Sequence, residues 1–145
     1  MEESKIVLKG RGLTYGKGEG EAIVYPYSIE IGTISGGVVR ERGPIFGQRI
    51  LDKVCIFRSG RGTTHGGAFV IKMIRDMTAP RAIVYLESEP IVVGGALMAQ
   101  ELYGRTVPIV DRLERNPLEV IENGDYVSVD ADKGEVTITK KTTMR

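Results

Sequence analysis

Two threonine hydroxyls, one imidazole and two guanidinium groups fall within ten residues of this chain. The stretch is Arg58-Ser59-Gly60-Arg61-Gly62-Thr63-Thr64-His65-Gly66-Gly67. Glycines at this density let backbone N–H groups turn toward a bound anion, and the amino end of a following helix adds its dipole. Several donors of this kind favour a carboxylate or phosphate of a small substrate. The stretch therefore predicts an anion site.

The residues alone leave more than one interpretation of each side chain. His65 is the only histidine, and a lone histidine in a loop is more often a hydrogen-bonded polar residue than a catalyst. Thr63 or Thr64 can serve as a helix N-cap, because threonine is common at that position. Arg58 and Arg61 can be solvated charges. No complete set of catalytic groups is visible in the chain.

The site stretch lies between a predicted strand and a predicted helix. The strand predicted at 50–57 ends in the apolar run 54–57, which is typical of a buried strand. Residues 68–74 place their apolar side chains on one side of a helix that must end before Pro80.

The other elements are predicted from similar patterns. Pro26 should end the second strand or place the next residues at a sheet edge. Strands first and last, with βαβ elements between them, predict a β layer packed on a mixed sheet whose other face carries helices. We predict strands at 5–8, 21–25, 82–86 and 107–110, helices at 95–102 (closed by Gly104) and 116–121, and a hairpin of 126–130 with 135–139.

Two further segments carry more chemistry than a scaffold requires. Glu87 and Glu89 come after a predicted strand and precede Gly94-Gly95; they are either solvated charges before a close-packed helix entry or part of a site. Residues 35–47 form a long glycine-rich loop, and such loops in a compact domain often bind substrates or partners.

Length, charge and cysteine content restrict the function classes. A chain of 145 residues fits one domain, 1–145, with a core of its own. A net charge of +1 gives no basis for binding nucleic acid or an anionic membrane. Cys55 is the only cysteine, so no disulfide is possible within the chain and no metal site is expected in it. Neither a signal peptide nor a spanning segment is visible, which predicts a cytoplasmic protein.

Six groups of short motifs succeed one another between residues 18 and 130. They are Gly18-Glu19-Gly20-Glu21-Ala22-Ile23-Val24; Gly36-Gly37-Val38-Val39 with Gly43-Pro44 and Gly47; Lys53-Val54-Cys55-Ile56-Phe57 with Ser59-Gly60-Arg61-Gly62; Glu89-Pro90-Ile91 with Gly95-Ala96; Val107-Pro108-Ile109-Val110; and Asn116-Pro117-Leu118-Glu119-Val120-Ile121-Glu122-Asn123-Gly124-Asp125. In this order they resemble the aconitase X small subunit, or swivel domain, family. Each motif is weak alone, whereas the ordered set is specific.

The resemblance implies a swivelling β/β/α three-layer domain of the α/β class, the counterpart of the mobile domain of aconitase. It implies a hydro-lyase of two subunits, a heterodimer or a larger assembly. An aconitase-like large subunit would bind an iron–sulfur cluster, and this chain would bind no cofactor alone. Together they would dehydrate (R)-5-phosphomevalonate to trans-anhydromevalonate 5-phosphate in isoprenoid synthesis by the mevalonate pathway.

The resemblance also implies roles for the site stretch. In that family the serine directly after Gly-Arg-Gly accepts the proton, and Thr63 stands at that position here. A threonine hydroxyl can do the same chemistry with a more restricted χ1, and the helix terminus and Arg61 would stabilise its alkoxide. His65 and Gly67 also depart from the family pattern. The residues expected to bind substrate are Gly60, Arg61, Gly62, Thr64, His65 and Gly66.

Three alternatives stay open at this point. The same dehydration can act on a hydroxyproline or another hydroxy acid. The chain can be a non-catalytic, partner-binding subunit in which Thr63 has lost the role of base. Thr64-His65-Gly66-Gly67-Ala68 loosely resembles a phosphohistidine loop, but the segment that should come directly after such a loop, here 99–108, lies more than 30 residues later.

Overall fold

Eight strands of the described chain form one sheet, and two short strands form another. The computed structural model describes residues 4–61 and 65–141. The strands of the main sheet are β1 (Lys5–Lys9), β2 (Arg11–Gly12), β3 (Lys17–Ile29), β6 (Lys53–Gly60), β7 (Ala82–Tyr85), β8 (Ile109–Asp111), β9 (Tyr126–Asp130) and β10 (Glu135–Thr139). The remaining elements are η1 (Ile31–Thr33), β4 (Ile34–Ser35), β5 (Val38–Val39), α1 (Gly66–Arg75), α2 (Pro90–Tyr103) and α3 (Pro117–Val120).

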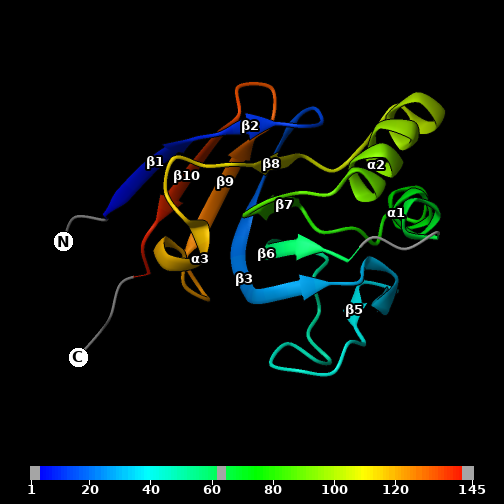
Figure 1. Ribbon diagram of the computed structural model, residues 1–145, viewed down its shortest axis with the longest axis horizontal. Coiled ribbons are helices and arrows are strands. Elements are labelled where there is room, and N and C mark those ends of the chain that lie inside the picture. Colours follow the sequence, from blue (N-terminus) through cyan, green and yellow to red (C-terminus); the bar gives the residue numbers. More distant parts are fainter. Residues whose placement is uncertain (1–3, 62–64, 142–145) are drawn as a thin grey trace.

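The main sheet closes on itself because one segment of chain supplies both of its outer strands. Its order is β1-β10-β9-β3-β6-β7-β8-β2, and only Gly10 separates β1 from β2 in the sequence. The sheet thereby forms a barrel. Gly12 lies directly against the backbone just after β9, since a Cβ at Gly12 would overlap the carbonyl oxygen of Ala131. A side chain at Gly12 would therefore push the closing strand away. Figure 1 shows β1 and β2 running on from one another along the top of the barrel.

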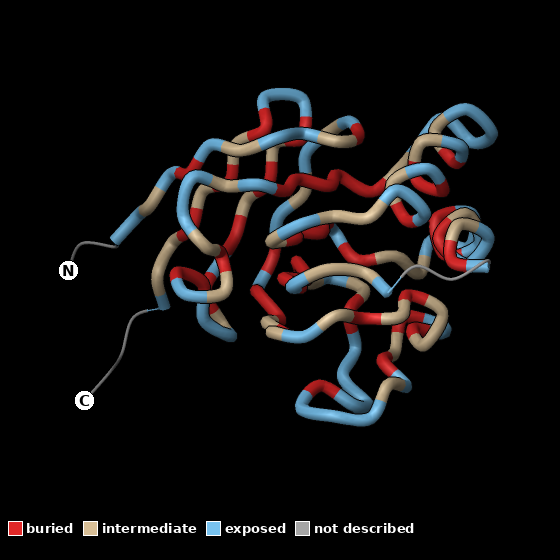
Figure 2. Tube along the Cα trace, viewed as in Figure 1, coloured by how far each residue is buried: buried red, intermediate tan, exposed pale blue. Residues whose placement is uncertain are grey.

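Strands β6 and β7 are apolar on both faces, and this gives the fold two cores. Val54 and Ile56 face the barrel interior, where they pack with residues of β1, β9 and β10. Cys55 and Phe57 face the other way and pack beneath α1 and α2. Two β layers and one helical layer result, with the buried residues along the middle of the molecule (Figure 2), so the predicted layered α/β architecture is confirmed.

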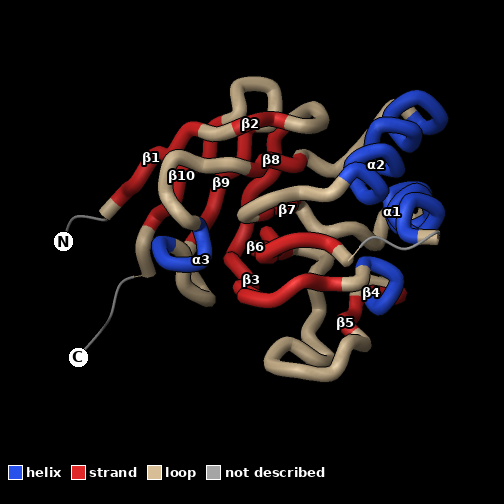
Figure 3. The backbone as a smooth tube through the Cα atoms, viewed as in Figure 1, coloured by secondary structure: helices blue, strands red, loops and turns tan. Residues whose placement is uncertain are grey.

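The connection from β3 to β6 is mostly loop, with η1 and the small β4–β5 sheet inside it (Figure 3). Its surface is polar, but a few apolar side chains anchor it in the core on the helix side. These are Ile31, Ile34, Val39, Ile45 and Ile50. The long glycine-rich loop predicted from the sequence is thus fixed to the same side of the sheet as the helices.

The expected effect of Pro26 is partly wrong. Strand β3 continues through Pro26 to Ile29, with a register shift against β6 between Tyr25 and Ser28. A bulge of this kind tolerates a residue without an N–H. On its other side β3 pairs with β9 only over its first five residues, so Pro26 does lie where one side of the strand has no ladder to complete.

Several further boundaries differ from the predictions, since β3 begins at Lys17, β6 at Lys53 and β8 at Ile109. Strand β6 runs on to Gly60, into the stretch expected to be loop. Helix α2 begins at Pro90 rather than at Gly95, because Glu89 caps it and proline suits its first position.

Several local predictions are confirmed. Gly104 ends α2 in the left-handed region, with φ of 70°. Asn116 caps α3 by accepting a hydrogen bond from the Leu118 N–H at 2.9 Å. β9 and β10 form the expected hairpin. None of the helices in the described part of the chain is long and apolar enough to cross a membrane.

Candidate active site

Four parallel strands, β3, β6, β7 and β8, end at one edge of the sheet, and both long helices begin there. Strand β6 leads into α1, and β7 leads into α2. Sheets of this kind bind ligands at the carboxyl ends of their strands, where the chain turns into a helix and exposes backbone donors. The stretch selected from the sequence is the β6–α1 connection at this edge.

The predicted base, Thr63, lies outside the described residues, as do Gly62 and Thr64. The described residues on either side of them are Arg61, which comes directly after β6, and His65, the N-cap of α1. The predicted base is therefore part of a short connection between a buried strand and the amino end of a ten-residue helix.

The amino end of α1 has no side-chain cap among the described residues. His65 has φ of −101° and ψ of 0°, and its imidazole makes no hydrogen bond to the first turn. That turn contains no Asp or Glu, whereas Lys72 and Arg75 in the last turn match the helix dipole. The positive end of α1 is thus not neutralised by an acidic side chain of its own first turn.

The amino end of α2 is capped by a carboxylate. Glu89 accepts hydrogen bonds from the N–H of Ile91 at 2.7 Å and from the N–H of Val92 at 2.8 Å. The interpretation of Glu89 as a solvated charge is therefore wrong, because its carboxylate is bound to the backbone as a helix cap. Glu87, the other carboxylate of that segment, forms an exposed ion pair with Arg112 at 2.8 Å.

Two glycines bring the two helix termini together. Gly67 in α1 and Gly95 in α2 are in backbone contact, since a Cβ at Gly95 would lie 2.6 Å from the carbonyl oxygen of Gly67. A Cβ at Gly60, the last residue of β6, would lie 3.0 Å from Cγ of Glu89. The ends of β6, α1 and α2 therefore meet within a small space, and Figure 1 shows the two helices side by side.

Arg61 is held by the backbone of β3 and by a carboxylate from the β3–β6 connection. Its backbone N–H donates to the carbonyl of Ile29 at 2.8 Å, which continues the β3–β6 pairing by one residue. Its guanidinium donates to the carbonyl of Ser28 at 2.6 Å and to Glu41 Oε1 at 2.7 Å. Arg61 is thus a directed group rather than a freely solvated charge. Glu41 was not singled out in the sequence, because nothing in its local pattern distinguishes it from an exposed loop carboxylate.

Arg58 lies apart from this arrangement. Its Nε donates to the carbonyl of Pro26 at 3.0 Å, and the residue is exposed. The structure therefore keeps Gly60, Arg61, His65 and Gly66 of the predicted binding set around the β6–α1 connection, and gives Arg58 a separate contact on β3.

A buried carboxylate fixes the entry to α2. Asp111, at the end of β8, is fully buried and forms a two-bond ion pair with Arg11, each bond 2.9 Å long. It also accepts the N–H of Ser88 at 3.0 Å. Burial raises the pKa of Asp111, but the bonds from Arg11 and Ser88 outweigh burial and hold that pKa below its ordinary value. Asp111 comes directly after a predicted strand, and that position was the available sign of its role.

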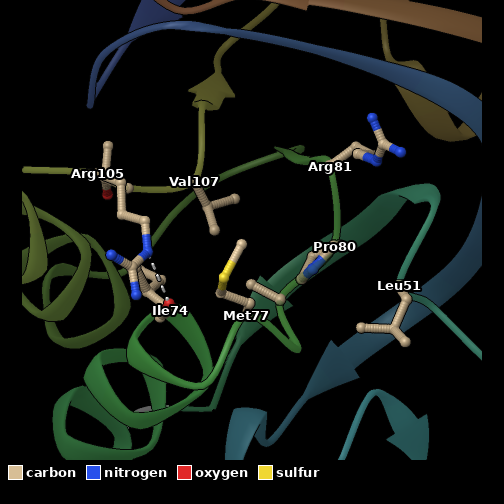
Figure 4. A pocket seen from close by; sticks show the side chains of 9 residues that line it. Leu51, Ile74, Met77, Pro80, Arg81, Arg105 and Val107 are labelled. Atoms are coloured by element: carbon tan, nitrogen blue, oxygen red, sulfur yellow. Dashed lines mark hydrogen bonds between the residues drawn. The ribbon is translucent and has the colours of Figure 1, made fainter.

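A cavity of about 400 Å³ lies at the opposite edge, where β7 and β8 begin and the helices end. Figure 4 shows Met77 among its lining side chains, and Arg105 donating to the backbone of α1 at the carbonyl of Ile74. Its lining residues are Leu51, Ile74, Met77, Ala79, Pro80, Arg81, Arg105, Thr106 and Val107. None of these belongs to the β6–α1 connection, so this cavity is separate from the candidate site.

The described residues offer no group of three or more His, Cys, Asp or Glu side chains placed to hold a metal ion. Cys55 is fully buried, and burial raises the pKa of its thiol to about 12. A thiolate ligand is therefore disfavoured at this position.

Comparison with known proteins gives a consistent result. A family model described as aconitase X swivel domain matches residues 7–138. The phosphomevalonate dehydratase small subunit of Methanosarcina acetivorans is 35% identical over 139 residues, which cover 93% of this chain and 92% of the relative. The protein of the same name from Thermococcus kodakarensis is 36% identical over 138 residues, 90% of this chain and 95% of the relative.

Solved structures agree with these relatives. A crystal structure of Thermococcus kodakaraensis aconitase X in its holo-form matches with a TM-score of 0.75 and 34% identity, over 93% of this chain and 99% of that chain. A UPF0107 protein solved by NMR in solution matches with a TM-score of 0.82 and 30% identity, over 93% of this chain and all of the other. The predicted fold class is confirmed by these likenesses.

Proposed function

The chain belongs to the aconitase X swivel domain family, and from this membership we propose that it is the small subunit of a phosphomevalonate dehydratase. The observation that carries the proposal is the similarity over about nine tenths of the chain to relatives of that name. The reaction is the removal of water from (R)-5-phosphomevalonate, which gives trans-anhydromevalonate 5-phosphate. The chain acts as one domain, 1–145, in the cytoplasm.

In this reaction a base removes a proton from the carbon beside the substrate carboxylate, and the hydroxyl on the next carbon leaves as water. We assign the base to Thr63, which stands where the family has its catalytic serine. The amino end of α1 supports this assignment, because its positive dipole end can stabilise an alkoxide close to it. The groups that hold the carboxylate or phosphate of the substrate are Gly60, Arg61, Gly62, Thr64, His65 and Gly66.

The second subunit is an aconitase-like large subunit that holds an iron–sulfur cluster. When bound, such a cluster supplies the Lewis acid that helps the hydroxyl leave. The described residues of this chain do not fit the cluster, since Cys55 is buried in the core. We place the cluster on the large subunit and assign to this chain the base and the anion-binding groups of a shared site.

One helix face supports a partner subunit. Helix α2 carries large apolar side chains on its solvent side: Ile91, Met98 and Leu102 are 38%, 50% and 57% exposed. Glu101 is the only charged residue within the helix. Contiguous exposed apolar side chains often mark a contact with another protein, and the face begins at the helix terminus that adjoins the candidate site.

The test is reconstitution with an aconitase-like large subunit from the same organism. The pair should dehydrate 5-phosphomevalonate, and each subunit alone should not. Hydroxyproline and a short hydroxy acid serve as matched substrates in parallel assays. Turnover of either one without turnover of 5-phosphomevalonate would reject the proposed substrate, and a complex inactive on all three would leave only a binding subunit.

A further inference from the structure

We propose that Glu41 is a positioning residue of this enzyme, which acts by fixing the guanidinium of Arg61 at the start of the β6–α1 connection. The inference rests on the proposed function, because it assigns Arg61 to an anionic group of the substrate. It adds to the site a carboxylate from the β3–β6 connection, far from Arg61 in the sequence.

The geometry sets the direction of the guanidinium. Nη2 of Arg61 donates to Glu41 Oε1 at 2.7 Å, and Nη1 faces Glu41 Oε2 at 3.4 Å. Nη1 also donates to the carbonyl of Ser28 at 2.6 Å. A planar group bound from two directions cannot rotate freely. Within the described residues the structure gives Nε no acceptor, so this edge of the guanidinium remains for an anion.

The carboxylate of Glu41 is itself held on several sides. Its side chain is only 11% exposed, although Arg40 and Arg42 on either side of it are both exposed. Besides Arg61, it accepts hydrogen bonds from the Tyr25 hydroxyl at 2.6 Å and the Glu30 N–H at 3.3 Å. The Thr33 hydroxyl lies 3.4 Å away and donates to the Glu30 carbonyl at 2.7 Å. A partly buried carboxylate is stable only when its oxygens are satisfied in this way. The carboxylate of Glu41 therefore has one preferred position relative to the guanidinium of Arg61.

The charge state agrees with the geometry. Burial raises the pKa of Glu41, but hydrogen bonds from Arg61 and Tyr25 outweigh burial and place that pKa below its ordinary value. The bond to Glu41 raises the pKa of Tyr25 to about 12. At neutral pH the hydroxyl of Tyr25 is thus a donor to a charged acceptor.

The buried pair of Asp111 with Arg11 has a similar construction at the entry to α2, whereas two exposed pairs of the described chain lack it. In the pair of Glu87 with Arg112, both side chains are more than half exposed. In the pair of Lys53 with Glu21, the carboxylate is 60% exposed and lies near the start of β6. The Glu41–Arg61 pair instead joins the end of β3, the end of β6 and the β3–β6 connection, next to the predicted catalytic residue.

The experiment uses the assembled two-subunit enzyme. In Glu41→Gln the Michaelis constant for 5-phosphomevalonate should rise about tenfold while kcat stays within about twofold, because a contact to the anion is lost equally in ground and transition states. Glu41→Asp, which keeps the charge, should recover part of the loss. Tyr25→Phe should show about a threefold rise, because it removes one neutral donor. Glu21→Gln removes the same charge from β3, near the start of β6. It serves as the control, and its Michaelis constant should not change.

A second readout does not depend on activity. NMR of the free chain should resolve the Nη–H protons of Arg61 as separate signals, because the bonds to Glu41 and Ser28 hinder rotation about the Cζ–Nη bonds. These signals should broaden or merge in Glu41→Gln and not in Glu21→Gln. An unchanged Arg61 signal overturns the proposal, and so does an unchanged Michaelis constant in an active, assembled Glu41→Gln enzyme. If the wild-type pair is inactive on 5-phosphomevalonate, the proposed function fails, and the NMR comparison alone then decides whether Glu41 positions Arg61.

Discussion

Helices α1 and α2 begin at the same edge of the sheet and contact each other through glycine, yet their amino ends differ. The first turn of α2 is satisfied by Glu89, and the backbone just before it is fixed by buried Asp111. The N-cap of α1, His65, makes no such bond. Among the described residues, a side chain caps the amino end of α2 and none caps that of α1. This difference explains why the chemistry is expected at the β6–α1 connection and not at the β7–α2 connection.

The largest expected effect is a difference in kcat between a substitution at the amino end of α1 and one at the amino end of α2. Thr63→Ala in the assembled enzyme should lower kcat by about a hundredfold or more, because a positioned base contributes that much. Glu89→Gln, at the α2 terminus, should change kcat by less than about threefold, since it keeps one acceptor of the cap. Steady-state kinetics on co-purified complexes measures both.

Thr63→Ser is the matched control, because it restores the family residue and should be active. If Thr63→Ala retains full turnover in an intact complex, the role of base belongs to another residue.

The next effect tests the contact that joins the termini. Gly95→Ala places a Cβ against the backbone of Gly67, which should destabilise the protein by about 1–3 kcal/mol through overpacking. Gly94→Ala meets open space in the same helix and should stabilise it by up to about 1 kcal/mol, since alanine favours helix.

Urea denaturation of the free chain gives the free energy of unfolding for both alanine variants. Equal stabilities would show that the two helices are not held in backbone contact at Gly67 and Gly95.

A smaller effect compares the caps themselves. Glu89→Ala should cost about 1 kcal/mol of stability, because it removes the side-chain acceptor of an N-cap. His65→Ala should change stability by less than about 0.5 kcal/mol, as expected for a surface side chain that makes no capping bond. Thermal unfolding of the two variants side by side is sufficient, and a larger loss in His65→Ala than in Glu89→Ala would reverse the comparison.

The smallest effect concerns pH. The pKa of Asp111 is lowered in the fold from its ordinary value of 3.8, so its contribution to stability is present above that value and is lost as pH falls through the lower, folded value. The Ser88 amide, which donates to Asp111, should lose protection from hydrogen exchange in this acid range. Its exchange is measured relative to amides of β7, corrected for the intrinsic rate. A ratio that stays constant from pH 6 to the acid limit of the folded state would contradict the role given to Asp111.

Local signals in the sequence predicted the elements well, and contacts between distant residues account for what they missed. Asn116-Pro117, Gly104 and the turn at Asp132-Lys133-Gly134 each determine their own backbone geometry, and each was predicted correctly. Gly94-Gly95 indicated a helix entry, but Gly95 is needed inside α2 for the contact with Gly67.

In the candidate site, too, local signals were predictive and contacts between distant residues were not predicted. Arg61 and His65 were expected beside a helix terminus and lie there. No local pattern shows that the carboxylate of Glu41 is turned inward onto Arg61, because its donors come from β3, from Glu30 just after β3 and from the residue after β6.

The way in which β1 and β2 close the barrel affects how the chain folds during its synthesis. β1 must wait for β10, its partner from the other end of the chain, and β2 must wait for β8. Pairings between such distant residues form late and slowly. The barrel therefore cannot close until β10 has been synthesised, and until then the edge of β1 has no partner strand.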